Sequence, residues 1–181
     1  LSDETSAITV TLNSPSKSFN TAGLMQSNVI CSDIEMRRRV DRVINIFEVC
    51  EVNPFGPDAL VAAYNESEEW LDELNRYLYD NYLELKRFFA EYMPKIEVLK
   101  LEGTYLVWVD ISALEFTSDE LEAKLRDEGK VYLNSGTMYG RRAGQGYMRI
   151  NIACPRSRMI DGLTRMAKVL APYMEDDCDM G

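Results

Sequence analysis

Residues 14–24 read Ser-Pro-Ser-Lys-Ser-Phe-Asn-Thr-Ala-Gly-Leu and lie between two short apolar runs, residues 8–12 and 28–31. Short apolar runs bounded by turn residues are typical of strands, so we expect strand, polar loop, short helix or turn, and strand. Pro15 fixes the backbone between two serines, and Lys17 follows them. Such a loop suits a small anion bound beside an amine that can attack a carbonyl to form a Schiff base. The plainer interpretation is a solvated loop lysine, because lysine side chains are mostly exposed.

The order of residues in this loop closely resembles the cofactor-lysine segment of fold-type I pyridoxal-phosphate enzymes. The likeness is closest to the MalY/PatB-type C–S lyases, or cystathionine β-lyases, which have an aminotransferase-like fold. The resemblance implies that Lys17 forms the Schiff base with pyridoxal 5′-phosphate and that Ser14 and Ser16 lie near the cofactor phosphate. Ordinary class I aminotransferases carry a phosphate-binding arginine eight residues after the lysine, where this chain has Met25. Because a bidentate phosphate partner is missing there, the lyase branch is favoured over a plain aminotransferase.

The composition bounds the class of protein and its partners. The chain has 181 residues, 46% of them hydrophobic, which is ample for a core. With 30 acidic and 20 basic side chains the formal net charge is −10, which argues against nucleic acid or an anionic membrane as the main partner. The 4 cysteines form no Cys-x-x-Cys pair and there is no histidine, so we expect neither a zinc site nor a Ser-His or Cys-His nucleophile.

The sequence also predicts the compartment of the protein and its relation to a longer polypeptide. No apolar run approaches the roughly 20 residues that span a bilayer, so we expect a soluble, reduced, cytoplasmic protein without a membrane partner. The first residues lead almost at once into a strand that needs a partner sheet. We therefore expect this chain to be the C-terminal part of a longer polypeptide.

Hydrophobic periodicity divides the chain into three predicted parts. Residues 1–53 hold the lysine loop and a helix that Ser32 and Asp33 can cap, and the resemblance implies that they are a remnant of the large cofactor-binding domain. Residues 54–93 start with a Pro- and Gly-rich break. They continue, from about residue 59, as one long interdomain helix or as two helices with a kink near residues 66–69. Residues 94–181 form a small C-terminal domain.

The small domain is predicted to hold a mainly antiparallel sheet covered by helices. The expected strands are residues 96–101, 105–111, 131–133 and 147–154, with a flexible glycine-rich loop over residues 134–146. A capping box at Thr117–Glu120 opens one helix. A last helix follows Pro155, with these residues inside: Ile160, Leu163, Ala167 and Leu170. The fold class is thus α/β, with an α+β small domain, as in the C-terminal part of an aminotransferase-like fold.

Strand alternation singles out Arg149. It sends Met148 and Ile150 to the core and Arg149 to the other face with Tyr147 and Asn151. There the planar guanidinium can grip a carboxylate through two parallel hydrogen bonds, although an exposed arginine on a one-sided sheet is the plainer interpretation. Residues 146–157 resemble the same family's signature for the arginine that binds the substrate α-carboxylate, and residues 102–110 resemble its small-domain hairpin. The resemblance implies that role for Arg149.

By this resemblance the parent protein is an enzyme, a pyridoxal-phosphate-dependent C–S β-lyase. It would act on sulfur amino acids such as cystathionine or cystine, release pyruvate, ammonia and a thiol, and form a homodimer. An aminotransferase of the same superfamily is the alternative. The phosphate cup and the groups around the cofactor ring precede the lysine in such enzymes, so we expect these 181 residues alone to have little or no activity.

Two further classes remain as alternatives. Ser14 and Lys17 match the Ser-x-x-Lys of serine β-lactamases and penicillin-binding proteins, but the chain has neither Ser-Asp-Asn nor Lys-Thr-Gly. The second alternative is a non-catalytic interaction domain that binds a partner through the long helix and the acidic surface.

Overall fold

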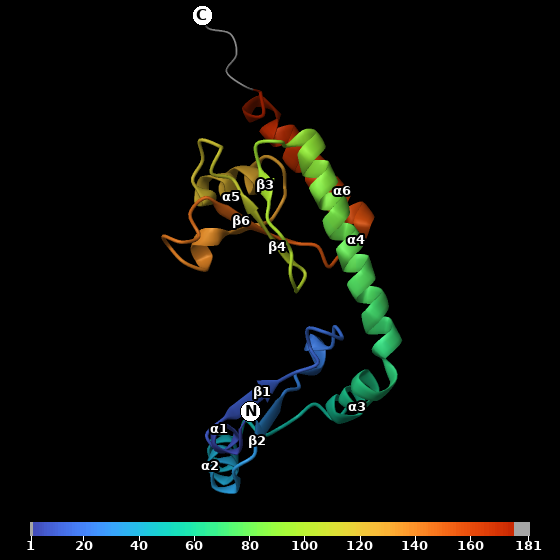
Figure 1. Ribbon diagram of the computed structural model, residues 1–181, viewed down its shortest axis with the longest axis vertical. Helices are drawn as coiled ribbons and strands as arrows, with labels where there is room; N and C mark the ends of the chain where they lie inside the picture. The colour runs from blue at the N-terminus through green and yellow to red at the C-terminus, as the bar shows by residue number, and fades with distance from the viewer. Residues whose placement is uncertain (1, 176–181) are drawn as a thin grey trace, which may run out of the picture. The chain divides into compact units, whose positions relative to one another are not determined.

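The computed structural model describes residues 2–175. The chain forms two compact units that divide between Leu74 and Asn75, inside helix α4 (Glu68–Tyr92) (Figure 1). This boundary lies within residues 54–93, the range assigned above to the linker and long helix. The three-part division itself stays a prediction.

The first unit begins with helix α1 (Asp3–Ala7) and a β-hairpin. Strand β1 (Val10–Asn13) pairs antiparallel with β2 (Asn28–Cys31), and the short 3-10 helix η1 (Ala22–Leu24) lies in the connection between them. The order strand, polar loop, short helix, strand is therefore confirmed. The pairing brings the two ends of residues 14–27 together, so the lysine loop closes a hairpin.

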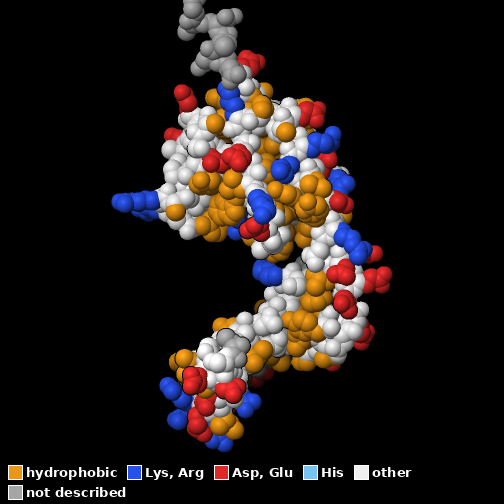
Figure 2. Space-filling view, viewed as in Figure 1, with side chains coloured by type: hydrophobic (Ala, Val, Ile, Leu, Met, Phe, Trp, Pro, Cys, Tyr) orange, Lys and Arg blue, Asp and Glu red, His pale blue; other side chains and the backbone are white. Residues whose placement is uncertain are grey.

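Three helices follow the hairpin. In α2 (Ile34–Ile46) the Asp33 side chain accepts a hydrogen bond from the Met36 amide at 2.7 Å, which confirms the predicted cap. Helix α2 has no buried residue. Hydrophobic side chains also lie on the visible surface of the first unit (Figure 2). Helix α3 (Gly56–Glu66) is separated from α4 by Ser67, so the predicted kink near residues 66–69 is a break between two helices.

The second unit is built on a 4-stranded antiparallel sheet in the order β3-β4-β6-β5. Its strands are β3 (Glu97–Val98), β4 (Leu106–Asp110), β5 (Asn134–Ser135) and β6 (Tyr147–Asn151). Alternate residues of β4 and β6 are buried, among them Val107, Val109, Met148 and Ile150. This sheet face and the buried stripes of the helices form the core of the unit.

The strand predicted at residues 131–133 is wrong. The Val131 amide instead donates to the Leu125 carbonyl at 3.0 Å and so helps to end helix α5 (Ser118–Asp127). Lys130 adopts a left-handed conformation, with φ of 52°, which turns the chain at that point. Because the Val131 donor is used at the helix end, the sheet gains its edge strand only at Asn134.

Helix α6 (Arg156–Leu170) packs with a stripe shifted from the predicted one. Leu163 and Leu170 are buried as expected, together with Met159 and Met166. Ile160 and Ala167, predicted inside, are half-buried and line a groove with residues of α4. The side of α6 that faces the core therefore includes Met159 and Met166, each one position before a residue that was predicted to lie inside.

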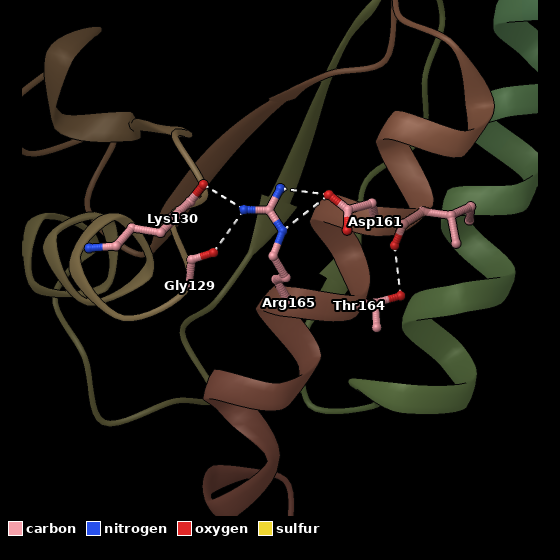
Figure 3. Close-up of polar contacts among 6 residues, drawn as sticks. Gly129, Lys130, Asp161, Thr164 and Arg165 are labelled. Carbon is pink, nitrogen blue, oxygen red and sulfur yellow. Dashed lines mark hydrogen bonds and ion pairs between the residues drawn. The ribbon is translucent and has the colours of Figure 1, made fainter.

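An arginine of α6 fixes the turn after α5 (Figure 3). Arg165 Nη1 donates to the carbonyl oxygens of Gly129 at 2.9 Å and Lys130 at 2.7 Å. Its Nε and Nη2 donate to Asp161 Oδ2 at 3.2 and 2.9 Å. One guanidinium therefore satisfies two carbonyls of a strained turn while its own charge is balanced by a carboxylate one helical turn away.

The surface of both units is of mixed charge. Acidic and basic side chains are interspersed on the face shown in Figure 2. Within residues 2–175, no helix combines the length and the apolarity that crossing a bilayer requires.

Candidate active site

Lys17 lies on a turn at the closed end of the β1–β2 hairpin, and its side chain is exposed. The Phe19 amide donates to the Pro15 carbonyl at 2.9 Å and the Thr21 amide donates to the Ser16 carbonyl at 3.1 Å. These two bonds close the backbone around the lysine. In the part of the chain that the structure describes, the Lys17 amine makes no hydrogen bond or ion pair. A primary amine on a closed, polar turn is therefore accessible to a carbonyl compound.

The two serines before Lys17 are used differently. Ser14 Oγ donates to the Gln26 carbonyl at 2.7 Å and accepts from the Ser16 amide at 3.2 Å, so its proton holds the loop closed. The Ser16 hydroxyl has no such partner among the described residues. Ser16 is thus the hydroxyl donor that remains free for an anion, and Ser14 shapes the turn that presents it.

Aromatic side chains support the lysine turn from the helices of the same unit. The Phe19 ring lies edge-on to Tyr64 of α3 at 5.7 Å and stacks with Trp70 of α4 at 6.2 Å, measured between ring centroids. Such pairs stabilise by about 0.5–1.5 kcal/mol beyond their buried area. The turn two residues before Phe19 is therefore anchored by packing as well as by its backbone hydrogen bonds.

Arg149 lies on β6, in the second unit, on the sheet face opposite the core. Met148 and Ile150 are buried while Tyr147 and Arg149 are half-buried, so the predicted alternation is confirmed. Arg149 Nη2 donates to Asn134 Oδ1 at 3.1 Å, and its Nε is buried without a hydrogen-bond partner among the described residues. A buried donor left unpaired costs about 1–3 kcal/mol, and the accessible donor of this guanidinium is Nη1, which makes no hydrogen bond among the described residues.

Two aromatic residues set the position of this guanidinium. Its Cζ lies 4.6 Å from the centroid of the Tyr139 ring, in a cation–π contact. Trp108 is directly opposite Arg149 in the sheet, and its ring meets that of Tyr139 edge-on at 5.4 Å. The Tyr139 ring covers one face of the guanidinium, and Asn134 accepts a hydrogen bond from Nη2. The remaining part of the guanidinium is left to face a ligand.

The loop that carries Tyr139 is held by a buried serine. Ser118, the first residue of α5, is 0% exposed, and its Oγ accepts from the amides of Gly146 at 2.9 Å and Tyr147 at 3.1 Å. Gly144 approaches Gly136 so closely that a Cβ on Gly144 would lie 1.9 Å from the Gly136 carbonyl oxygen. Only glycine fits there, so the predicted glycine-rich loop contains a close backbone contact.

A carboxylate of α5 holds the start of the same loop. Asp119 Oδ1 accepts from Ser135 Oγ at 2.6 Å and also from Thr137 Oγ1. These two hydroxyl donors, Ser135 first, lower the pKa of Asp119 below its ordinary value, because they stabilise the ionised form. The carboxylate is therefore charged at neutral pH and ties β5 and η2 (Gly136–Met138) to the helix.

Comparison with known proteins identifies the family. The model for aminotransferase class I and II matches residues 1–165 of this chain. The chain belongs to this family. Among curated members, it is 37% identical over 171 residues to "Cystathionine beta-lyase PatB" of Bacillus subtilis and 34% identical over 169 residues to "Cystathionine beta-lyase" of Corynebacterium glutamicum. These matches cover 94% and 89% of this chain, and 44% and 42% of the relatives.

Solved structures of the family give the same result. Cystalysin from Treponema denticola, described as containing pyridoxal 5′-phosphate, superposes with a TM-score of 0.87 at 31% identity. A PLP-bound putative aminotransferase from Clostridium difficile 630 gives 0.87 at 40% identity. The chain spans 43% of the length of each, and 94% and 93% of this chain is covered. The predicted fold class, a mixed helix and sheet chain of aminotransferase type, is confirmed.

The predicted site residues fall into two groups in this family member. Ser14, Ser16 and Lys17 share one turn of the first unit, and Arg149 belongs to the second unit. Sequence reasoning missed Asn134, Tyr139 and Trp108 around Arg149. Of these, Trp108 had a usable signal, because it lies in the apolar run that pairs with the arginine strand.

Proposed function

We propose that this chain supplies the cofactor lysine and the carboxylate-binding arginine of a pyridoxal-phosphate-dependent C–S β-lyase. The substrates would be sulfur amino acids such as cystathionine or cystine, and the products a thiol, pyruvate and ammonia. The observation that carries the proposal is the closed turn that presents the unpaired Lys17 amine next to the free Ser16 hydroxyl. Family membership and the two curated relatives named as cystathionine β-lyases support it.

The residues present fit the cofactor. Lys17 would hold its aldehyde, and Ser16 would donate to its phosphate, with Ser14 close by but engaged with Gln26. When bound, pyridoxal phosphate supplies an electron sink for the negative charge that develops at the substrate α-carbon. Lys17 Nζ is then the basic group of this chain that takes the α-proton. Arg149 receives the α-carboxylate through Nη1, which makes no hydrogen bond among the described residues, while Asn134 and Tyr139 keep the guanidinium in place.

An aminotransferase of the same superfamily is the second candidate, because both reactions use the same lysine and arginine. Met25 favours the lyase. It stands where ordinary class I aminotransferases carry a phosphate-binding arginine, and it is 81% exposed. A thioether offers the phosphate no charged hydrogen bond. A non-catalytic interaction domain is the third candidate.

The proposal extends to the surroundings of the site. Residues 1–53 would belong to the cofactor-binding domain, residues 54–93 to the linker and interdomain helix, and residues 94–181 to the small domain. The full-length protein would be a cytoplasmic homodimer that binds neither nucleic acid nor membrane. Free thiols at Cys31, Cys50 and Cys154 in the described part of the chain agree with a reducing compartment.

The test is chemical labelling of the full-length protein. It is incubated with pyridoxal phosphate, reduced with borohydride and digested, and the peptides are mapped by mass. We expect the label on Lys17, and loss of thiol release from cystathionine in Lys17→Ala. The matched control is Lys100→Ala, another exposed lysine, whose activity should stay at the wild-type level.

Three results would contradict the proposal. A label on a different lysine with Lys17 unmodified would remove the cofactor role. Unchanged thiol release in Lys17→Ala would favour the interaction domain, and transfer of the amino group to a keto acid without thiol release would favour the aminotransferase.

A further inference from the structure

Gln26 stands where the lysine loop returns to the hairpin. It follows Met25, whose backbone is left-handed with φ of 50°, and it lies two residues before β2. Its carbonyl oxygen accepts the hydrogen bond from Ser14 Oγ at 2.7 Å. The backbone of Gln26 therefore closes the loop, and its side chain is left for another role.

That side chain packs on a glycine at the start of α3. A Cβ added to Gly56 would lie 2.4 Å from Gln26 Oε1, 3.3 Å from Cδ and 3.5 Å from Cβ. Gly56 is buried and belongs to the Pro- and Gly-rich break that precedes the helix. The Gln26 side chain thus occupies the space that any side chain at position 56 would need. We call this packing the Gln26–Gly56 contact.

Hydrogen bonding does not account for the Gln26–Gly56 contact. Gln26 Oε1 is buried and has no partner in the part of the chain that the structure describes. An unpaired buried acceptor costs about 1–3 kcal/mol, so a glutamine is a poor choice here for stability alone. What the contact provides is a defined position, because a side chain packed against a buried backbone has little room to move.

Two hydrogen bonds connect Gln26 to the cofactor lysine of the proposed function. The Gln26 carbonyl accepts from Ser14 Oγ, and the same Oγ accepts from the Ser16 amide at 3.2 Å. Ser16 directly precedes Lys17. A displacement of Gln26 therefore reaches the backbone next to Lys17 through a single hydroxyl group.

Helix α3 supports the lysine turn at a second place. The Phe19 ring meets Tyr64 edge-on at 5.7 Å. Gly56 is the first residue of α3 and Tyr64 is in its last turn, which separates the two supports by about 12 Å along the helix axis. Two separated supports fix the orientation of the turn as well as its position, whereas one support leaves it free to pivot.

We propose that Gln26 is a positioning residue for the cofactor lysine and that it acts by packing on Gly56. The inference rests on the proposed lyase function and adds one residue to it. Gln26 sets the place of Lys17 through Ser14 and Ser16, and this role needs no contact with the cofactor or the substrate.

Gly56→Ala in the full-length protein tests the contact while leaving the glutamine in the sequence. The new Cβ would lie about 1 Å too close to Oε1, so the Gln26 amide must move. The backbone of Gly56 is not left-handed, so alanine fits there and should not lower the free energy of unfolding. We expect kcat for thiol release from cystathionine to fall on the order of tenfold with KM almost unchanged, since a 1 Å misplacement can cost up to roughly 100-fold.

Further variants separate positioning from a general loss of packing. Gln26→Ala should lower kcat by a similar factor, and adding Gly56→Ala to it should lower kcat no further, because no amide is left to displace. Gln26→Met keeps the length and volume of the side chain and should restore kcat to within about twofold of the wild type. Gly162→Ala is the matched control, because its Cβ would have no atom within 4 Å.

A second measurement needs no turnover. The amides of Ser16, Phe19 and Thr21 donate the hydrogen bonds that close the lysine turn. Hydrogen–deuterium exchange of the peptide that contains them should be on the order of tenfold faster in Gly56→Ala and Gln26→Ala. It should match the wild type in Gln26→Met and in Gly162→Ala.

The outcomes distinguish this inference from the proposed function. Wild-type kcat in Gly56→Ala, or an additive loss in the double variant, would overturn the positioning role in a protein that is still a lyase. Failure of Gln26→Met to restore kcat would overturn packing as its mechanism. Faster exchange in the same variants of a protein that releases no thiol would instead refute the proposed function and leave Gln26 as the residue that fixes the turn.

Discussion

Replacing Asn81 with alanine should destabilise the second unit more than the size of the side chain suggests. Asn81 is in α4 and is 0% exposed. Its Nδ2 donates to the carbonyls of Ile152 at 3.0 Å and Cys154 at 3.2 Å, and its Oδ1 accepts from Arg156 Nε at 3.1 Å. One amide therefore joins the long helix to the chain between β6 and α6.

The magnitude follows from what each partner loses. The Ile152 carbonyl also accepts from the Cys154 amide at 2.9 Å, so it keeps a donor. The Cys154 carbonyl loses its donor from Asn81, and because Cys154 is half-buried the cost is about 1 kcal/mol, the lower end for an unpaired polar group. Arg156 is exposed, and water replaces its partner. Adding about 0.5–1.5 kcal/mol for the weakened bond to Ile152, we expect Asn81→Ala to lower the free energy of unfolding by about 1.5–2.5 kcal/mol.

The assay is urea unfolding followed by Trp108 fluorescence in a Trp70→Phe background, so that the signal comes from the second unit. Asn75→Ala is the matched control: it makes the same change in the same helix at an exposed position. Asparagine to alanine gains some helix propensity at both sites, at most about 0.7 kcal/mol. The difference between the two variants therefore isolates the buried amide.

The reasoning would be refuted by equal unfolding free energies for Asn81→Ala and Asn75→Ala. It would also be refuted if Asn81→Leu, which fills the space without a donor, restored the wild-type value, because the cost would then come from lost packing.

Two further predictions concern α5 and its loop. Thr117→Ala removes one half of the capping box, in which Thr117 Oγ1 accepts from the Glu120 amide at 3.2 Å. It should lower the free energy of unfolding in urea by about 1 kcal/mol. Thr117→Ser should recover most of this loss, and an equal loss in both variants would contradict a cap. The hydroxyls of Ser135 and Thr137 lower the pKa of Asp119 from its ordinary value of 3.8, so its stabilising effect is present above that pH and is lost as the pH falls through the lowered pKa. The stability difference between wild type and Asp119→Ala should therefore shrink below pH 3.8, and a difference that is the same at every pH would disprove it.

The local signals in the sequence were sufficient where one segment sets its own structure. Asp33 and Thr117 cap the helices that their positions predict, because a side-chain oxygen there reaches amides two or three residues ahead. The face of β6 that carries Arg149 follows from the two-residue period of a strand. The break at Ser67 lies where the helical period of the apolar residues is interrupted.

Prediction failed where distant segments compete for the same groups. Val131 reads as a strand residue, yet its amide is used by Leu125 and the turn is held by Arg165, which lies 36 positions after Gly129. The stripe of α6 is displaced toward Met159 and Met166 because the burial of a helix face depends on what packs against it.

By itself, the sequence determined the order of the elements, the family resemblance and the two residues, Lys17 and Arg149, on which the proposed chemistry depends. Only the tertiary structure decided that the Ser14 proton closes the loop while the Ser16 hydroxyl stays free, and that Tyr139 lies against the guanidinium. The physical reason is range: caps and strand alternation act over a few residues, whereas hydrogen-bond partners and ring contacts depend on which distant segments meet.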